Sequence, residues 1–393
     1  MRVDLVTKEY PPEVYGGAGV HVTELVRALR RDLEVQVRAF GAPRDAPGVT
    51  SYPVPAELAG ANASLQTLGV DLVIAQDAAG ADLVHSHTWY ANEAGRLAQL
   101  LHGIPHVMTA HSLEPLRPWK AEQLGGGYRI SSRIEAEAVA TADAVIAVSD
   151  GMRADLLRVY PFVDPDRVAV IRNGVDLEVW RPRHDAAVLQ AHGIDPDRPT
   201  VVFVGRITRQ KGLPYLLAAA RRLPAETQLV LCAGAPDTPE ILAEVEAGLA
   251  ALRAERTGVV WIPEHLPIEQ LSAVLTAATV FVCPSVYEPL GIVNLEAMAC
   301  ELPVVGTATG GIPEVVEDGV TGRLVPIEQA DDGTGTPTDP EAFVAALAET
   351  LREVLADPAA ARRMGEAGRR RAAERFSWSA IADETRALYA SLL

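Results

Sequence analysis

Lysine and cysteine are both scarce in this chain of 393 residues. Its only lysines are Lys8, Lys120 and Lys211, so arginine carries nearly all of the positive charge. The three cysteines lie far apart in apolar stretches, at Cys232, Cys283 and Cys300. Their spacing excludes a zinc site built on paired cysteines and predicts reduced, buried thiols.

Aromatic residues are also few, and the chain has no net positive charge. Aromatics make up 5% of the chain, and 35 basic against 52 acidic residues give a formal net charge of −17. Stacking on single-stranded nucleic acid needs aromatics, and a phosphate backbone or an anionic membrane surface needs a basic face. We therefore expect no nucleic-acid and no membrane partner.

The sequence shows no membrane span and no secretory signal. The long uncharged segment 271–287 contains Ser, Thr and Pro284 and is predicted to be a helix end followed by a strand. The N-terminus lacks a basic segment followed by an apolar core. A cytoplasmic location is the expectation.

Short β-branched runs alternate with longer helical stretches along the whole chain. This pattern predicts an α/β protein with doubly wound, Rossmann-like parallel sheets, and the length predicts two domains. Predicted strands in the first half are 3–6, 34–40, 82–85, 106–109, 144–148 and 168–171. Those in the second half are 201–204, 228–232, 259–262, 280–283 and 304–305.

A polar stretch between two Asp-Pro-Asp-Arg turns, at 164–167 and 195–198, separates the two halves. We place the domains at 1–172 and 173–376, with a hinge that starts at Asn173. The last helix, 377–393, is expected to pack back on the first domain. Ligands of such sheets bind beyond the carboxyl ends of the strands, so the residues that follow each strand are the candidates for chemistry.

Three glycines, Gly16, Gly17 and Gly19, precede a helix predicted over 20–30. Glycines there let backbone N–H groups approach an anion at the positive end of the helix. The segment lacks the Lys-Ser/Thr of a P-loop and the third glycine of a dinucleotide fingerprint. A tight strand-to-helix connection is the alternative.

Arg206 and Lys211 lie five residues apart after the first strand of the second domain. Arginine holds phosphate with two hydrogen bonds and lysine acts as a mobile point charge, so the pair suits a diphosphate that gains charge as it leaves. A solvated basic loop is the alternative.

Glu288 and Glu296 are separated by seven residues at the start of an apolar helix. A carboxylate can hold the vicinal hydroxyls of ribose, and Gly291 and Ile292 leave backbone amides available for phosphate. Because glutamate on a helix is commonly a solvated residue, the spacing alone leaves that reading open.

His111 ends a predicted strand, and His85 and His87 alternate along another, with His85 expected to point inward. For His111, a core histidine with one hydrogen bond is the alternative to a ligand contact. The chain has no His-x-x-x-His and no paired Cys/His spacing, so we expect no metal and no other cofactor.

Together these motifs resemble the retaining glycosyltransferases of the GT-B fold, family 4, over almost the whole chain. The match consists of the Glu288-x7-Glu296 motif, the Arg206/Lys211 pair, the glycine loop and Thr109-Ala110-His111. Segments 8–22 and 111–120 resemble the actinobacterial glycogen synthase type. Those relatives use ADP-glucose and are associated with making α-maltose 1-phosphate from glucose 1-phosphate.

The resemblance implies two Rossmann-like domains that face across a cleft, an acceptor domain first and a nucleotide-sugar domain second. The resemblance implies that Arg206 and Lys211 bind the donor diphosphate and that the amides of Gly291 and Ile292 bind the phosphate. It implies that Glu288 binds the glucose hydroxyls and Glu296 the ribose. It also implies that His111 contacts the glucose beside the reacting carbon. Gly16, Gly17 and Gly19 also belong to the predicted donor site.

The acceptor is less well defined, because Thr88 and Arg133 depart from residues common in these relatives. A run of cations after His111 favours an anionic sugar phosphate over a neutral glucan. Interleaved glutamates leave open that these cations only form surface ion pairs. We assign acceptor binding to Lys8, Ser112, Lys120 and Arg133.

The resulting prediction is a hexosyltransferase that makes α-maltose 1-phosphate from ADP-glucose and glucose 1-phosphate in α-glucan biosynthesis. A same-face displacement is favoured, since the residues at the ends of two strands of the first domain are His111 and Ser149 and not acidic residues. Glycogen elongation, another nucleotide sugar, an epimerase and a non-catalytic nucleotide-sugar binding module are the alternatives. The base of the nucleotide and the oligomeric state, including a homodimer, are left open.

Overall fold

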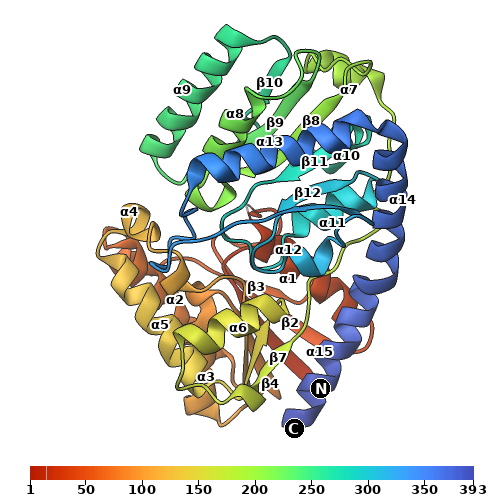
Figure 1. Ribbon diagram of the computed structural model, residues 1–393. Coiled ribbons are helices and arrows are strands. Elements are labelled where there is room, and N and C mark those ends of the chain that lie inside the picture. The colour runs from red at the N-terminus through yellow and green to blue at the C-terminus, as the bar shows by residue number, and fades with distance from the viewer. Residues whose placement is uncertain (15) are drawn as a thin grey trace. The chain divides into compact units, whose positions relative to one another are not determined.

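The computed structural model describes residues 1–14 and 16–393 (Figure 1). These residues form two compact units. Unit 1 contains Met1–Gly174 and Trp378–Leu393, and unit 2 contains Val175–Ser377. The domain boundaries predicted from the sequence lie at residues 172 and 376, and the predicted roles of the two domains stay predictions.

Unit 1 contains a seven-stranded parallel sheet in the order β3-β2-β1-β4-β5-β6-β7. Its strands are β1 (Arg2–Thr7), β2 (Glu34–Phe40), β3 (Val49–Tyr52), β4 (Leu83–His87), β5 (His106–Ala110), β6 (Ala144–Ala147) and β7 (Val168–Val170). Its helices are α1 (Gly17–Leu29), α2 (Ala63–Asp77), α3 (Trp89–His102), α4 (Lys120–Leu124), α5 (Gly127–Thr141), α6 (Asp150–Val159) and α15 (Trp378–Leu392). Short 3-10 helices are η1 (Ala56–Leu58), η2 (Glu114–Leu116) and η3 (Pro165–Arg167).

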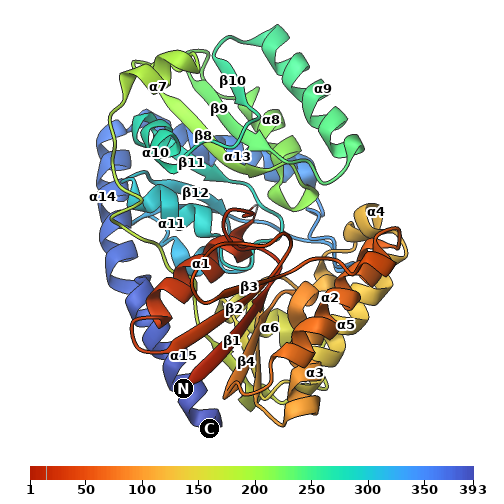
Figure 2. The ribbon, with the colours of Figure 1, turned by 180° about the vertical axis from the view of Figure 1, so that it is seen from behind.

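Helices cover both faces of this sheet because successive strand residues point to opposite sides. Val3 and Leu5 of β1 pack in one core with residues of α1 and α15, whereas Val6 packs in another with α2 and α3. Figure 2 shows α1 and α15 on one side of the strands and α2, α3 and α5 on the other. The C-terminal helix is therefore part of the core of unit 1.

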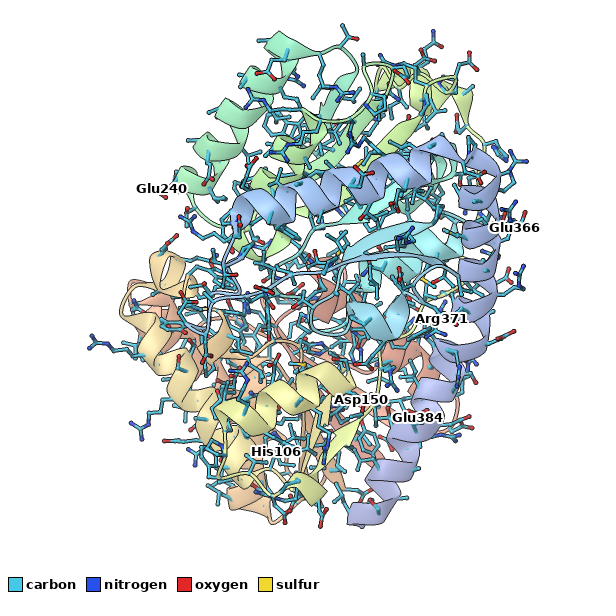
Figure 3. All side chains as sticks on the ribbon, viewed as in Figure 1. His106, Asp150, Glu240, Glu366, Arg371 and Glu384 are labelled. Atoms are coloured by element: carbon cyan, nitrogen blue, oxygen red, sulfur yellow. The ribbon has the colours of Figure 1, made fainter. Side chains whose placement is uncertain are left out.

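Unit 2 contains a six-stranded parallel sheet in the order β10-β9-β8-β11-β12-β13. Its strands are β8 (Thr200–Arg206), β9 (Gln228–Gly234), β10 (Val259–Ile262), β11 (Val280–Cys283), β12 (Val304–Thr307) and β13 (Gly322–Val325). Its helices are α7 (Ala186–Ala191), η4 (Arg209–Lys211), α8 (Leu213–Ala220), α9 (Pro239–Glu255), α10 (Ile268–Ala277), α11 (Ile292–Ala299), α12 (Ile312–Val315), α13 (Pro340–Ala356) and α14 (Pro358–Arg375). Arg371 of α14, labelled in Figure 3, donates to the carbonyls of Val315 and Glu314 at 2.9 Å and ties α14 to α12.

The prediction of two doubly wound parallel-sheet domains is confirmed. Segment 271–287 forms the end of α10 and the strand β11, as expected, and the three cysteines are free and buried. The predicted start of the first helix at residue 20 is wrong, because Gly17 is already helical. Among the described residues, no helix is both long and apolar enough to cross a membrane.

Candidate functional site

A partly buried ion pair lies at the carboxyl end of the sheet in unit 2, with 17% of the Lys211 side chain and 7% of the Glu288 side chain exposed. The ammonium of Lys211, which ends η4, lies 2.6 Å from Oε2 of Glu288 in the segment after β11. The hydroxyl of Ser285 donates to the same oxygen at 3.0 Å. Burial lowers the pKa of Lys211, but the charge of Glu288 and its hydrogen bond raise it by more, so the ammonium stays charged.

Two glycines make close backbone contacts beside the residues of this ion pair. Gly212 has φ +64°, and a Cβ there would lie 2.0 Å from the carbonyl oxygen of Pro284. Gly310 has φ +53°, and a Cβ there would lie 2.0 Å from the carbonyl oxygen of Glu288. Only glycine combines this backbone conformation with this close approach, so both residues help to place Lys211 and Glu288.

Arg206, the last residue of β8, forms an ion pair with Asp237. The backbone N–H of Asp237 donates to the carbonyl of Ile207 at 3.1 Å, which holds this carboxylate beside the strand end. Asp237 was not predicted from the sequence, because it lies 31 residues after Arg206 and belongs to no recognised motif. The structure thus gives the predicted phosphate-binding arginine a fixed partner.

Glu296 is buried in α11, with 8% of its surface exposed. Burial raises its pKa to about 7, opposed by the charge of Lys211, so the side chain titrates near neutral pH. The solvated helix face considered in the sequence analysis is therefore wrong for Glu296. Lys211, Glu288 and Glu296 belong to one electrostatic cluster.

Asn294, also in α11, was missed by the sequence analysis. It is fully buried, and its Oδ1 and Nδ2 have no hydrogen-bond partner in the part of the chain that the structure describes. A Cβ at Gly291 would lie 2.5 Å from Nδ2, so this amide lies against the loop predicted to bind phosphate. Its position three residues after Gly291 is the only signal that the sequence offers.

In unit 1, the glycine loop lies against the carboxylate of Glu9. The N–H of Gly16 donates to Oε2 of Glu9 at 2.8 Å, and a Cβ at Gly19 would lie 2.8 Å from both Cβ and Oε2 of Glu9. Gly17 is the first residue of α1. The start of this helix, where we predicted an anion of the donor, thus carries the anionic side chain of Glu9.

Three histidines from three elements converge in unit 1. His21 lies in α1, His87 ends β4, and His111 follows β5. Nδ1 of His87 and Nε2 of His111 are 3.0 Å apart, and the His21 and His111 rings meet edge-on with centroids 4.7 Å apart. Burial lowers the pKa of all three, to about 4 for His21, so the imidazoles are neutral at neutral pH.

His85 supports this cluster from the interior, as expected. Its Nδ1 is 2.6 Å from the hydroxyl of Tyr389 in α15, and its Nε2 is 2.7 Å from the hydroxyl of Thr109 in β5. The expectation of no metal was based on local spacing along the sequence and stays a prediction. The fold adds a proximity that local spacing does not show, because nitrogens of His21, His87 and His111 lie within 4.8 Å of one another.

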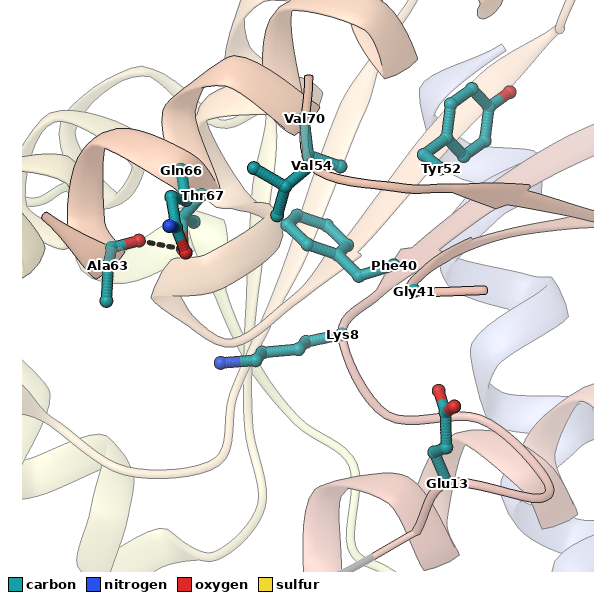
Figure 4. A pocket seen from close by; sticks show the side chains of 10 residues that line it. All are labelled: Lys8, Glu13, Phe40, Gly41, Tyr52, Val54, Ala63, Gln66, Thr67 and Val70. Carbon is teal, nitrogen blue, oxygen red and sulfur yellow. Dashed lines mark hydrogen bonds between the residues drawn. The ribbon is translucent and has the colours of Figure 1, made fainter. Parts of the chain in front are cut away.

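Lys8 is the one predicted acceptor residue that lines a pocket found in unit 1. The pocket measures about 280 Å³ and lies at the ends of β1, β2 and β3 beside α2. In Figure 4 the Lys8 side chain extends beneath Phe40 toward α2. Its ammonium also lies 3.7 Å from the centre of the Tyr90 ring, and burial lowers its pKa.

The other three predicted acceptor residues do not line this pocket. Ser112 accepts a hydrogen bond from Arg117 at 2.7 Å, and Lys120 is buried and bonded to Gln123. Arg133 has a side chain that is 79% exposed and pairs with Glu137 at 2.7 Å. Arg133 therefore matches the surface ion pair that the sequence analysis held as the alternative.

Both units have recognised relatives. Glycosyltransferase Family 4 matches residues 15–179, and Glycosyl transferases group 1 matches residues 186–371. The chain is 58% identical to the α-maltose-1-phosphate synthase of Mycobacterium tuberculosis over 99% of each chain. It is 34% identical to a D-inositol 3-phosphate glycosyltransferase of Xylanimonas cellulosilytica, over 95% of this chain and 91% of that one.

The solved structures agree with these matches. The sucrose-phosphate synthase of Thermosynechococcus elongatus has a TM-score of 0.80 and 26% identity, over 100% of this chain and 98% of that one. The similarity thus extends through both sheets and the residues at their carboxyl ends. The chain belongs to family 4 of the GT-B glycosyltransferases.

Proposed function

We propose that this glycosyltransferase is a retaining hexosyltransferase that transfers glucose from ADP-glucose to glucose 1-phosphate and forms α-maltose 1-phosphate for α-glucan synthesis. The observation that carries this proposal is the 58% identity, over 99% of both chains, to a protein of that product name. The more distant relative, at 34% identity, also has a phosphorylated compound in its name, D-inositol 3-phosphate.

The donor is assigned to unit 2. Arg206 and Lys211 would bind the diphosphate, with the amides of Gly291 and Ile292, and Glu288 would accept hydrogen bonds from the glucose hydroxyls. The partly buried ammonium of Lys211, held in place by Glu288, supports this assignment, because a preorganised charge stabilises a leaving diphosphate more strongly than a fully solvated one. Glu296 would hold the ribose hydroxyls.

The proposed reaction is a same-face displacement. The bond from the anomeric carbon to the diphosphate oxygen breaks as a bond to an acceptor hydroxyl oxygen forms, and the departing phosphate oxygen takes the hydroxyl proton. Neutral His111 would hold a glucose hydroxyl beside the reacting carbon. Arg206 and Lys211 would stabilise the charge that develops on the diphosphate.

The acceptor is assigned to unit 1, where Lys8 projects into a pocket of the size of a small ligand. A phosphate on glucose would pair with the Lys8 ammonium through charge-assisted hydrogen bonds. Ser112 and Lys120 remain proposed acceptor contacts, and Arg133 has the least support, since it is exposed and paired with Glu137.

A matrix of donors and acceptors tests the proposal. ADP-glucose and UDP-glucose are each supplied with glucose 1-phosphate, with glycogen or with no acceptor, and kcat/KM and the anomer of the product are measured. We expect the highest value for ADP-glucose with glucose 1-phosphate, and an α-linked product. A preference for glycogen contradicts the acceptor, a preference for UDP-glucose contradicts the donor, and nucleotide binding without transfer supports the non-catalytic alternative.

A further inference from the structure

The histidine cluster of unit 1 contains more nitrogen ligands than a single contact with a sugar would use. One nitrogen from each of His21, His87 and His111 lies within 4.8 Å of the other two. Four nitrogens bound tetrahedrally to zinc at 2.0–2.1 Å would be about 3.3 Å apart. The observed spacing is therefore within about 1.5 Å of that of a metal site.

These imidazoles also have unused hydrogen-bonding capacity. His21 and His87 are 2% and 0% exposed. Both ring nitrogens of His21 and Nε2 of His87 lack a hydrogen-bond partner of normal geometry among the described residues, although the Asn173 side chain lies near enough to His21 to raise its pKa slightly against the effect of burial. Among the other buried histidines of unit 1, His85 uses both nitrogens, whereas His106, labelled in Figure 3, lies 2.8 Å from the hydroxyl of Ser86 through Nε2 and has an Nδ1 without a partner among the described residues. His21 differs from both, because neither of its nitrogens has a hydrogen-bond partner there. Buried nitrogens without partners are unfavourable unless a ligand engages them.

We propose that His21, His87 and His111 form a binding site for a divalent transition-metal ion of the zinc type. Three neutral imidazoles are typical ligands of Zn²⁺, Co²⁺, Ni²⁺ and Cu²⁺, and they are poor ligands for Mg²⁺ and Ca²⁺, which prefer oxygen. Three protein ligands leave a fourth position for water or another small donor. His111 is only partly buried, so an ion would reach the proposed site from the side on which His111 lies.

The neighbours of the cluster hold its rings in place. The His85 ring lies 4.2 Å from the His87 ring between centroids, and His85 is itself fixed by Tyr389 and Thr109. The Trp378 ring contacts His21 edge-on at 5.5 Å. Because these supports come from β4, β5 and α15, the site needs the complete unit 1.

The effect on activity rests on the proposed function. There, His111 holds a hydroxyl of the donor glucose, so a metal ion bound to its ring would compete with the donor. We therefore expect micromolar Zn²⁺ to inhibit transfer competitively with ADP-glucose, and a chelator to reverse the inhibition.

The test measures binding first, without any substrate. Untagged, chelator-treated protein is titrated with Zn²⁺ by calorimetry and with Co²⁺ by visible absorption. We expect one ion per chain, with the intense bands of four-coordinate Co²⁺. His111→Asn should weaken binding at least tenfold, as should His21→Asn and His87→Asn if they fold. The matched control is His102→Asn, because His102 lies in α3 of the same unit and bonds to the carbonyl of Ala75.

The outcomes separate the two proposals. No stoichiometric binding, or equal affinity in the wild type and His111→Asn, overturns the metal site whatever the enzyme does. Histidine-dependent binding in a protein that transfers no glucose supports the site and contradicts the proposed function. Inhibition that His111→Asn leaves unchanged would assign the effect to another group and overturn the competition.

Discussion

Lys211 keeps its charge in a partly buried position because Glu288 lies 2.6 Å from its ammonium. A pair of this kind contributes little net stability, since the attraction mainly offsets the desolvation of both ions. In the proposed function, the pair keeps a cation in place before a diphosphate binds. Asp237 does the same for the Arg206 guanidinium.

Removing either cation should therefore affect turnover more than folding. We expect Lys211→Ala and Arg206→Ala each to lower kcat about 10²–10³-fold, which corresponds to about 2.7–4 kcal/mol. Arg209→Ala is the matched control, because Arg209 is a half-exposed cation in the same loop. Steady-state kinetics with thermal unfolding of each variant separates catalysis from stability; near-normal turnover in Lys211→Ala or Arg206→Ala would contradict the assignment.

Glu296 should make donor binding depend on pH. Its pKa of about 7 means that it is half protonated at neutral pH. A carboxylate accepts hydrogen bonds from both ribose hydroxyls better than the protonated acid does, so donor affinity should rise as pH rises through 7. Between about one unit below and one unit above the pKa, the ionised fraction changes roughly tenfold.

The measurement is the dissociation constant of ADP as a function of pH. We expect a roughly tenfold tighter value over that range for the wild type and a flat profile for Glu296→Gln. The same slope in both proteins would show that another group titrates. Circular dichroism of the variant checks that α11 remains folded.

At the scale of elements, the loops after the strands depend on close backbone contacts. Gly212 and Gly193 both have positive φ, of 64° and 67°, but only Gly212 has a carbonyl oxygen 2.0 Å from its missing Cβ. Gly193 has no atom within 4 Å of that position. Substitution of these two glycines therefore distinguishes two costs. The strain of a left-handed backbone applies at both positions, and steric overlap applies only at Gly212.

We expect Gly193→Ala to cost roughly 1–2 kcal/mol of unfolding free energy, the strain of a left-handed residue. Gly212→Ala adds the overlap with Pro284 and should cost about 3 kcal/mol or more. It should also lower kcat, because the Lys211 loop must move. Denaturant unfolding and kinetics of both variants test this; equal losses in the two would mean that the close approach is unimportant.

The contact between η2 and α5 contains a buried carboxyl pair. Oε1 of Glu135 accepts hydrogen bonds from the backbone N–H of Glu114 at 2.7 Å and from the hydroxyl of Tyr160 at 2.6 Å. Burial, and next the charge of Glu114, raise the pKa of Glu135 from 4.5 to about 8. The folded state therefore binds this proton more tightly than the unfolded state does.

This difference sets the sign of a pH effect on stability. The contribution of Glu135 is fully present below the unfolded pKa of 4.5 and is lost as pH rises through about 8. Glu135→Gln keeps the accepting oxygen and removes the charge, so its unfolding free energy should decline less over that window. Urea unfolding at several pH values measures it; a variant with the same decline as the wild type would assign the effect elsewhere.

At the scale of the whole molecule, the proposed transfer uses arginine and lysine where many enzymes use a metal ion. We therefore expect that a chelator changes the rate by no more than about twofold, or about 0.5 kcal/mol. Any gain on chelation would reflect release of an inhibitory ion from the histidine cluster. Activity lost to the chelator and restored by magnesium or manganese would contradict the proposed donor chemistry.

Local patterns in the sequence were sufficient for the fold class and for most individual strands. They failed at two of the four edge strands, β3 and β13, which pair on one side only and contain Thr, Ser, Gly and Arg among few apolar residues. An edge strand does not need two buried faces, so its sequence carries a weaker hydrophobic pattern.

The sequence by itself determined the alternation of strands and helices, the residues at the strand ends and the motif pairs Arg206 with Lys211 and Glu288 with Glu296. Only the tertiary structure paired Lys211 with Glu288 across 77 residues, placed Asp237 beside Arg206, and brought His21 to His87 and His111. Hydrophobic periodicity is a local property of a few residues. Which strand ends become neighbours depends on the order of strands in each sheet, and this order follows from packing of the whole unit.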